Sequence, residues 1–359
     1  MIGERTVQAN EIEQFHAELE RDALEGLWRI QAQRRSPRSR VQPYVWRWET
    51  LHRHLLRAGD LLATLERGAE RRVLVLANPG LTQFKAATHT IAANVQLIKP
   101  GEVAPAHRHT PTAIRFIIQG HGAYTTVEGE QIVMGEGDLI LTPNWTWHDH
   151  GNETTRPVIW MDALDVPFVN ALHASVHEPY PEERHPVLRT GDYSVRKYSA
   201  QLRPLGERGA PVFSPQRAYR WEATYATLTH LAAVGEASPY DDVAVEYVNP
   251  ATGGHALPTL GCAIQLLRPG VRTRAHRHTS SAVYHVFRGR GYSVIDGQRF
   301  DWAQGDFFVL PPWAWHEHAN TSPTEEAILF SVNDMPIFEA MALYREEPYP
   351  AHGGHQPQG

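Results

Sequence analysis

The chain has 359 residues and a formal net charge of -6, and it contains 27 Gly, 26 Pro, 21 His and a single cysteine, Cys262. This length exceeds that of a typical single domain, so we expect two domains or a duplicated core. The negative charge, without basic clusters, argues against nucleic acid or an anionic membrane as a partner, and one cysteine excludes an intramolecular disulfide. The first residues lack the apolar run of a signal peptide, and no segment approaches the roughly 20 apolar residues of a membrane helix, so we expect a cytoplasmic protein.

Helical patterns predict an N-terminal arm and linker within residues 1–70. Apolar residues recur at helical spacing from about residue 10 to residue 33, and a second helix is expected over residues 49–65. His52 and His54 fall on this second helix. Residues two apart on a helix face in nearly opposite directions, so this pair is not expected to bind one metal ion.

From residue 71 onward the pattern predicts an all-β core. Short runs in which apolar and polar residues alternate follow one another and are separated by glycines. The clearest runs are residues 90–99, 114–119, 123–127, 139–142 and 157–164. Because no helical pattern separates them, we expect antiparallel sheets closed into a barrel or jelly roll.

Two later segments are less regular. Residues 170–240 are rich in Pro, Arg and Tyr, which indicates a connector with short helices. His173 and His177 in this connector have the spacing of helical zinc ligands, but no third ligand is evident, so we expect a surface helix. Residues 351–359 consist of Gly, Pro, His, Gln and one Ala, a composition that predicts a disordered tail.

The strand-rich pattern occurs twice in the chain. The segment His107-Arg108-His109 recurs 169 positions later as His276-Arg277-His278, and His148 recurs 168 positions later as His316. Glycines, prolines and an asparagine recur at matching places, which indicates an internal duplication and two barrels. The expected organisation is an arm and linker (1–70), a first barrel (71–169), a connector (170–240), a second barrel (241–345) and a tail (346–359).

His107, His109 and His148 form a candidate metal site. Residues two apart on an extended strand project to the same side, and a third histidine 39 positions later could close a triangle around one ion. Histidine binds iron, copper, zinc and nickel alike, so the ligand type alone does not select the metal. The alternative, three histidines packed inside a barrel, does not explain the repeated spacing.

These motifs resemble the two-part cupin motif, present here twice, and the chain resembles the gentisate 1,2-dioxygenase family, which includes salicylate and 1-hydroxy-2-naphthoate dioxygenases. Ala113 and Ala282 occupy the places at which the usual cupin has a glutamate. The other segments that carry the resemblance are residues 71–80, 113–125, 146–153 and 343–346. The resemblance implies a bicupin of two antiparallel jelly-roll β-barrels with one Fe(II) per subunit in the first barrel, and a homo-oligomer, often a tetramer.

The resemblance also implies a substrate and a reaction. The substrate would be an ortho-hydroxybenzoate such as gentisate, salicylate or a substituted salicylate, opened by O2 between the carboxyl-bearing and hydroxyl-bearing carbons. Three neutral imidazoles leave a divalent ion with its full charge, which suits a substrate that brings carboxylate and phenolate oxygens. Arg115 shares a strand face with Ala113, so it is a candidate clamp for the carboxylate or, alternatively, the structural partner of an acid.

Further candidates surround this triad. His150 could face inward as an acid or base, and Asp162 could orient His150 or a substrate hydroxyl. Arg71 and Gln96 match positions that line the pocket in the family, and Asn94 shares a strand face with Gln96. A polar amide at Asn94 suggests a substituted substrate such as a halo- or nitrosalicylate, or 1-hydroxy-2-naphthoate. The remaining alternatives are a non-catalytic bicupin that binds a small carboxylic acid, and a metal-dependent isomerase with no oxygen requirement.

The second barrel keeps the histidines but not their surroundings. Tyr284 stands in place of Arg115, and we align Phe330 with Asp162. Catalysis is therefore expected in the first barrel, where metal ligands and a carboxylate clamp coincide. The second barrel is expected to be mainly structural, and its occupancy by a metal is left open.

Overall fold

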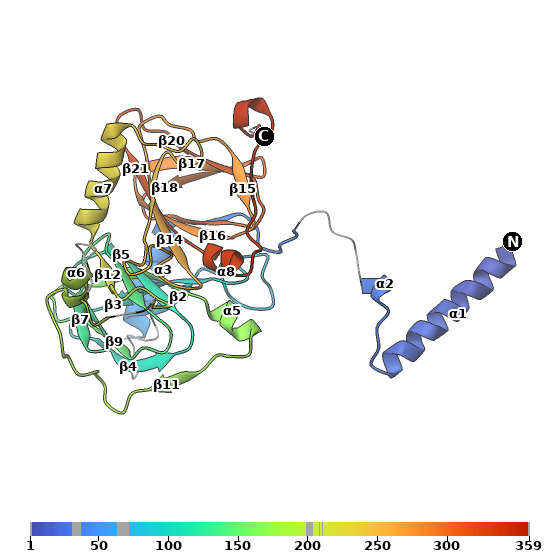
Figure 1. Ribbon diagram of the computed structural model, residues 1–359, viewed down its shortest axis with the longest axis horizontal. Coiled ribbons are helices and arrows are strands. Elements are labelled where there is room, and N and C mark those ends of the chain that lie inside the picture. The colour runs from blue at the N-terminus through green and yellow to red at the C-terminus, as the bar shows by residue number, and fades with distance from the viewer. Residues whose placement is uncertain are drawn as a thin grey trace. The chain divides into compact units, whose positions relative to one another are not determined.

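The computed structural model describes residues 2–30, 37–62, 72–198, 204–207, 209 and 211–357. The chain divides into two compact units, Met1–Pro37 and Arg38–Gly359. In the first unit, helix α1 (Ile2–Arg21) is followed by the short helix α2 (Leu27–Ile30) (Figure 1). The helical pattern expected over residues 10–33 is confirmed for residues 10–21 and 27–30, but the helix is interrupted because Ala23 adopts a left-handed conformation (φ 56°) just after α1. Residues 31–33 of that prediction lie outside the described residues.

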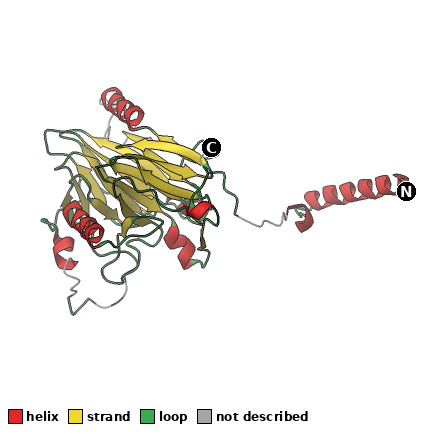
Figure 2. Cartoon of the chain, turned by 90° about the horizontal axis from the view of Figure 1, so that it is seen from above, coloured by secondary structure: helices red, strands yellow, loops and turns green. Residues whose placement is uncertain are grey.

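The second unit contains the predicted duplicated β core. Each copy has a six-stranded sheet and a five-stranded sheet, and all strand pairs between named strands are antiparallel. In Figure 2 the strands form stacked layers with helices on the outside. The five clearest predicted strands are all present, with ends within two residues of those expected.

The first barrel pairs one sheet of order β12-β8-β5-β10-β3-β2 with another of order β11-β4-β9-β6-β7. Its strands are β2 (Val73–Val75), β3 (Ala92–Ile98), β4 (Val103–His109), β5 (Ala113–Gln119), β6 (Tyr124–Val127), β7 (Glu130–Val133), β8 (Leu139–Thr142), β9 (His148–Gly151), β10 (Val158–Leu164), β11 (His177–Pro179) and β12 (Ala218–Tyr219).

The second barrel repeats this arrangement with the orders β1-β19-β16-β21-β14-β13 and β18-β17-β20-β15-β22. Its strands are β1 (Tyr44–Trp46), β13 (Val243–Glu246), β14 (Gly261–Leu267), β15 (His276–His278), β16 (Ala282–Arg288), β17 (Arg290–Ile295), β18 (Gln298–Ala303), β19 (Phe307–Leu310), β20 (His316–Asn320), β21 (Ala327–Asn333) and β22 (Glu346–Pro348).

The two barrels share one hydrophobic core. The largest buried cluster draws side chains from the six-stranded sheets of both barrels. Phe116 on β5 stacks on Phe330 of β21, with ring centroids 4.0 Å apart and an angle of 10°. Because side chains alternate across a strand, Arg115, the neighbour of Phe116, projects to the opposite face, into the first barrel. The alternation on these strands therefore divides residues between the shared core and the barrel interiors.

Two strand–helix segments link the barrels. Strand β1 joins β19 of the second barrel, and the helix that follows, α3 (Trp48–Leu61), packs against β3 of the first barrel. Strand β12 joins β8 of the first barrel, and helix α7 (Trp221–Val234) packs against β13 of the second. Helix α3 confirms the second predicted helix, whose last residues, 63–65, lie outside the described residues.

The same contact anchors both helices. The backbone N–H of Trp48 donates to Oδ1 of Asp306 over 2.8 Å, and that of Trp221 donates to Oδ1 of Asp138 over 2.9 Å. A carboxylate at a helix N-terminus is stabilised by the unpaired N–H groups and the helix dipole. The duplication therefore includes these linking segments as well as the barrels.

The connector contains α6 (Tyr193–Tyr198) and α7, while α5 (Val166–Ala171) begins just before it and α8 (Met335–Ala340) follows the second barrel. The predicted disorder of the tail is wrong for its described part, which includes the 3-10 turn η1 (His352–Gly354). Gln356 is buried because its backbone N–H donates to Glu317 over 2.9 Å and its side-chain amide donates to the Val294 carbonyl over 2.9 Å. Among the described residues, no helix is both long enough and apolar enough to cross a membrane.

Candidate active site

Strands β4 and β9 bring three histidines together. His107 and His109 lie two apart on β4, and His148 opens β9 directly opposite His107 in the antiparallel register. One candidate ligand nitrogen from each residue lies within 4.8 Å of the other two. The structure thus places the three predicted ligands around a single point.

Each imidazole is held through one nitrogen. The Nδ1 atoms lie 2.7–2.9 Å from backbone carbonyl oxygens, those of Pro105, Pro111 and Thr146 for His107, His109 and His148 respectively. A carbonyl can only accept, so Nδ1 carries the proton and the Nε2 lone pair is free for a metal ion. Nε2 of His148 is buried without a hydrogen-bond partner among the described residues, and an ion at this point would satisfy it.

The surroundings keep these imidazoles neutral. Burial lowers the pKa of His107 and His109 to about 4, and the charge of nearby Arg115 acts in the same direction. The pKa of His148 is lowered well below its usual value, again chiefly by burial. Because a metal ligand must be deprotonated, a neutral triad at physiological pH fits a divalent transition metal.

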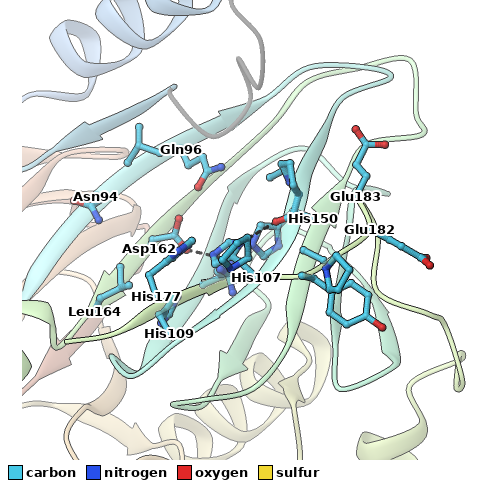
Figure 3. Close-up of a pocket in the computed structure, with 18 residues that line it drawn as sticks. Asn94, Gln96, His107, His109, His150, Asp162, Leu164, His177, Glu182 and Glu183 are labelled. Atoms are coloured by element: carbon cyan, nitrogen blue, oxygen red, sulfur yellow. Dashed lines mark hydrogen bonds and ion pairs between the residues drawn. The ribbon is translucent and has the colours of Figure 1, made fainter. Parts of the chain in front are cut away.

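Two members of the triad, His107 and His109, line a cavity of about 520 Å³, a size typical of small-molecule sites (Figure 3). Polar and ionisable side chains on its wall come from both sheets, and Pro179 and Tyr180 lie among its lining residues. The candidates from the sequence that line it are His107, His109, Asn94, Gln96, Arg115, His150 and Asp162.

Arg115 and Asp162 form a buried ion pair beside the triad. They are directly opposite each other on β5 and β10, with Nε of Arg115 3.2 Å from Oδ1 of Asp162. Arg115 also donates to the Thr142 hydroxyl, and the indole N–H of Trp160 donates to Oδ2 of Asp162 over 2.8 Å. Burial raises the pKa of Asp162, but Arg115 and the Trp160 bond oppose this shift. Asp162 therefore orients Arg115 in this structure, not His150.

His150 is oriented by a threonine. Nδ1 of His150 lies 2.6 Å from the Thr125 hydroxyl, and that hydroxyl donates to the Asp149 carbonyl over 2.9 Å. Since the hydroxyl proton is used there, Nδ1 of His150 must be the donor in their mutual bond. This fixes the tautomer and leaves Nε2 as the acceptor on a residue that lines the cavity.

The remaining candidates lie on neighbouring strands. Asn94 on β3 is directly opposite Asp162, and Gln96, two residues on, is opposite Trp160. Both line the cavity on the same wall as Asp162 (Figure 3). Arg71 lies outside the described residues.

Sequence reasoning missed His177. It lies on β11 opposite His109, and its ring stacks on that of His107 with centroids 5.0 Å apart. The surface helix expected around His173 and His177 is therefore wrong, because α5 ends at Ala171 and the chain then extends along β4. The segment His177-Glu178-Pro179 is followed by more prolines. Because proline within a sheet is largely confined to edge strands, this composition is the signal that could have indicated an edge strand.

Comparisons with known proteins show the family to which the chain belongs. The cupin domain family matches residues 94–166 and 263–333. The chain is 43% identical over 351 residues to the 5-aminosalicylate 1,2-dioxygenase of Comamonas sp, covering 96% of this chain and 92% of that protein. It is 36% identical to gentisate 1,2 dioxygenase 1 of Aquipseudomonas alcaligenes, covering 96% and 98% of the two chains. The crystal structure of a salicylate 1,2-dioxygenase from Pseudaminobacter salicylatoxidans superposes with a TM-score of 0.87 at 35% identity, covering 94% and 97%.

The chain belongs to the gentisate 1,2-dioxygenase family of bicupin oxidoreductases. The residues at equivalent positions of the two barrels can be compared directly. Tyr284 occupies the place of Arg115 in the second barrel, as aligned from the sequence. The counterpart of Asp162, however, is Ser331, which is opposite Tyr284 just as Asp162 is opposite Arg115. The alignment with Phe330 is wrong because an extra residue in the preceding loop restores the offset of 169, and Phe330 lies in the shared core.

Proposed function

We propose that this chain is a ring-cleaving dioxygenase that opens an ortho-hydroxybenzoate between its carboxyl-bearing and hydroxyl-bearing carbons with O2. The observation that carries this function is a cluster of three neutral histidines with free Nε2 atoms, two of which line a cavity together with a buried arginine. His107, His109 and His148 would hold the metal, for which we propose Fe(II). When bound, Fe(II) supplies the one-electron chemistry that lets a closed-shell aromatic ring react with O2.

Charge balance selects the substrate class. A divalent ion together with the Arg115–Asp162 pair leaves two positive charges among the buried groups of the site, since Glu182 and Glu183, which also line the cavity, are exposed. A substrate that brings one carboxylate and one phenolate neutralises them, whereas a neutral phenol leaves the site charged. We assign the substrate carboxylate to Arg115, whose planar guanidinium suits such a group and which Thr142 and Asp162 hold in place.

His150 has the geometry of a general base. Its Nδ1–H is fixed on Thr125, so its Nε2 lone pair can accept the phenol proton when the substrate enters. The pKa of His150 is lowered well below its usual value by burial and by the charge of Arg115, which keeps this lone pair available. In this proposal Asp162 positions Arg115 and does not contact the base.

The ring substituent would meet the wall formed by Asn94 and Gln96. A polar amide on that wall favours a substituted ring over plain salicylate, because a hydrogen bond formed in a buried site discriminates strongly against an analogue that lacks the group. The 5-aminosalicylate 1,2-dioxygenase of Comamonas sp, 43% identical to this chain, supports a ring with a substituent. We therefore propose 5-aminosalicylate or gentisate as the preferred substrate, with 1-hydroxy-2-naphthoate as the alternative.

We further propose that the protein is cytoplasmic and works as a homotetramer. Support for assembly comes from the first unit, where Phe15, Leu27 and Trp28 are about half or more exposed although they are large and apolar. Light scattering on the full chain, compared with a chain that begins at Arg38, would show whether this unit is needed for the assembly.

Oxygen uptake measured with four candidate substrates tests the proposed function. Protein loaded anaerobically with Fe(II) would be mixed with salicylate, gentisate, 5-aminosalicylate and 1-hydroxy-2-naphthoate while oxygen uptake and ring absorbance are followed. We expect uptake of one O2 per ring opened with at least one of the four compounds. No uptake with any of them, while the metal is bound, would favour a non-catalytic bicupin, and conversion without uptake would favour an isomerase.

A further inference from the structure

One wall of the cavity is formed by residues 177–183, here called the strap (Figure 3). All residues of the strap except Glu178 line the cavity. Its strand, β11, has three residues and lies at the edge of the five-stranded sheet, where it pairs only with β4 among the described strands. Because so short an edge strand is held by few backbone hydrogen bonds, side-chain contacts have a large share in fixing where this wall lies.

Arg108 links the strap to the strand that carries two of the metal ligands. It lies between His107 and His109 on β4, so its side chain projects to the opposite side from theirs. Glu178 is directly opposite it on β11, and the Nε–H and Nη2–H groups of Arg108 donate to its Oε2 over 2.9 and 2.7 Å. The two side chains are 25% and 44% exposed, and an ion pair as exposed as this contributes little stability by itself.

Two tryptophans complete the contact. The guanidinium carbon of Arg108 lies 4.2 Å from the ring centroid of Trp145 and 4.4 Å from that of Trp147, within the range of cation–π attraction. Trp145 reaches this place from a left-handed backbone conformation (φ 60°), which is rare for a bulky residue and costs free energy. Trp147 also meets the ring of Tyr180 in the strap edge to face, with centroids 4.9 Å apart. Arg108, Trp145, Trp147 and Glu178 are called the first clamp, because together they fasten the strap to β4.

The second barrel contains the same arrangement, here called the second clamp. The Nε–H group of Arg277 donates to Oε1 of Glu347 over 2.5 Å, and its guanidinium carbon lies 4.4 Å from the ring of Trp313 and 4.2 Å from that of Trp315. Trp313 is also left-handed (φ 65°), and Trp315 meets Tyr349 edge to face at 5.0 Å. Among the described residues that line the cavity of the first barrel, none belongs to the second clamp. A clamp is thus part of the fold of each barrel, and the first clamp holds a wall of the proposed substrate cavity.

We propose that the first clamp sets the width of the cavity, so that Arg108 is a positioning residue that determines which size of ring is bound. This inference rests on the proposed function, which supplies the substrate class. A wall already fixed in place favours a one-ring substrate because no freedom of the wall is lost on binding. A two-ring substrate needs more room. Salicylate and 1-hydroxy-2-naphthoate both carry a carboxylate beside a hydroxyl, so the ratio of their affinities reports the space for the ring.

Binding without turnover tests this role. The full chain would be loaded with Fe(II) and titrated calorimetrically with each of the two compounds in the absence of O2. In Arg108→Ala the Kd of salicylate should rise about 10-fold, as expected when one or two wall side chains must be ordered on binding, and that of 1-hydroxy-2-naphthoate at most about threefold. The matched control Arg277→Ala should lower the thermal denaturation midpoint by a similar amount and leave both Kd values unchanged. The iron content should equal that of the wild type in both variants.

Other results would overturn the proposal. Equal changes of the two Kd values in Arg108→Ala, or the same shift of their ratio in Arg277→Ala, would mean that the clamps only stabilise the barrels. Loss of iron from Arg108→Ala would mean that Arg108 acts on the histidines and not on the wall. If Arg108→Ala does not fold, as judged by circular dichroism, Glu178→Gln replaces it and should shift the ratio in the same direction by a smaller factor. An iron-loaded wild type that binds neither compound would instead contradict the proposed function, and this inference with it.

Discussion

Arg115 and Asp162 face each other across neighbouring strands, 3.2 Å apart at Nε and Oδ1, in the wall of the cavity that His107 and His109 also line. The two side chains are 5% and 8% exposed, so the pair provides charge in a space where water screens little. The guanidinium is thereby presented to a ligand with its orientation already fixed. This relationship, more than the histidines, distinguishes the first barrel from the second.

Replacing Arg115 with Gln should weaken capture of the carboxylate. Losing a buried charged partner costs about 2–5 kcal/mol, so kcat/KM should fall roughly 30-fold or more. The test is the ratio of kcat/KM for salicylate to that for salicylamide, in which the carboxylate is a neutral amide. That ratio should collapse in Arg115→Gln, and an unchanged ratio would mean that Arg115 is only the structural partner of Asp162.

The hydrogen bond between Thr125 and His150 should matter for catalysis, whereas the equivalent bond between Ser293 and His318 in the second barrel should not. Thr125→Val removes the acceptor that fixes the His150 tautomer, which should lower kcat by about 10- to 100-fold, as for other groups that orient a reactive histidine. The matched control is Ser293→Ala, which removes the same bond to His318 (2.8 Å) in the second barrel. Equal losses in the two variants would argue that the bonds only stabilise the barrels.

Asn94→Ala should change substrate choice. A hydrogen bond to a ring substituent is worth about 1–2 kcal/mol, so the preference for 5-aminosalicylate or gentisate over salicylate should fall by about 5- to 30-fold. Salicylate turnover by the same variant is the internal control. Similar turnover of gentisate by the wild type and by Asn94→Ala would remove the basis for this role.

Acid should destabilise the metal-free protein over a defined window. The folded pKa of His107 and His109 is about 4, below the usual value of 6.5. Between these values the unfolded chain binds more protons than the folded chain, so the free energy of unfolding decreases as pH falls from about 6.5 toward 4. Thermal denaturation across this range should show the decline. It should be shallower in a His107→Gln, His109→Gln double variant, and an equal slope would contradict the assignment.

The anchored helices predict a symmetric effect on stability. Asp138→Asn and Asp306→Asn each remove a carboxylate that accepts a helix N-terminal N–H and pairs with an arginine, Arg220 and Arg47 respectively. Each should lower the free energy of unfolding by about 1–3 kcal/mol. Asp301→Asn, in an exposed pair with Arg299, is the control and should change it little. A large effect from only one of the two variants would contradict the duplicated anchor.

Much of this architecture could be predicted because the signals were local and repeated. The fold could be predicted from the short strand-like runs and from the offset of 169 between the two copies. The histidine triads could be predicted from the His-x-His segments. Strand alternation also places Arg115 inside the barrel correctly. The features that could not be predicted depend on contacts between segments that are distant in the sequence. No local sequence pattern indicates such contacts.

Three particular residues show this limit. His177 reaches the site only because β11 adds to the edge of β4, 70 residues away, and its four-residue spacing from His173 suggested a helix instead. Ser331, not Phe330, matches Asp162 because a one-residue change in a loop resets which side chains face inward. Gln356 is ordered because Glu317 and Val294 accept its hydrogen bonds, although the composition of the tail indicates disorder.

The most direct test of the proposed chemistry is the fate of isotopically labelled dioxygen. Fe(II)-loaded protein would convert 5-aminosalicylate or gentisate under ¹⁸O2, with rapid quenching and mass spectrometry of the ring-opened product. We predict one heavy oxygen in the new carboxylate and a second in the new keto group, before that group exchanges with water. A ring-opened product without label, or no product while the His107, His109 and His148 site holds its metal, would contradict a dioxygenase.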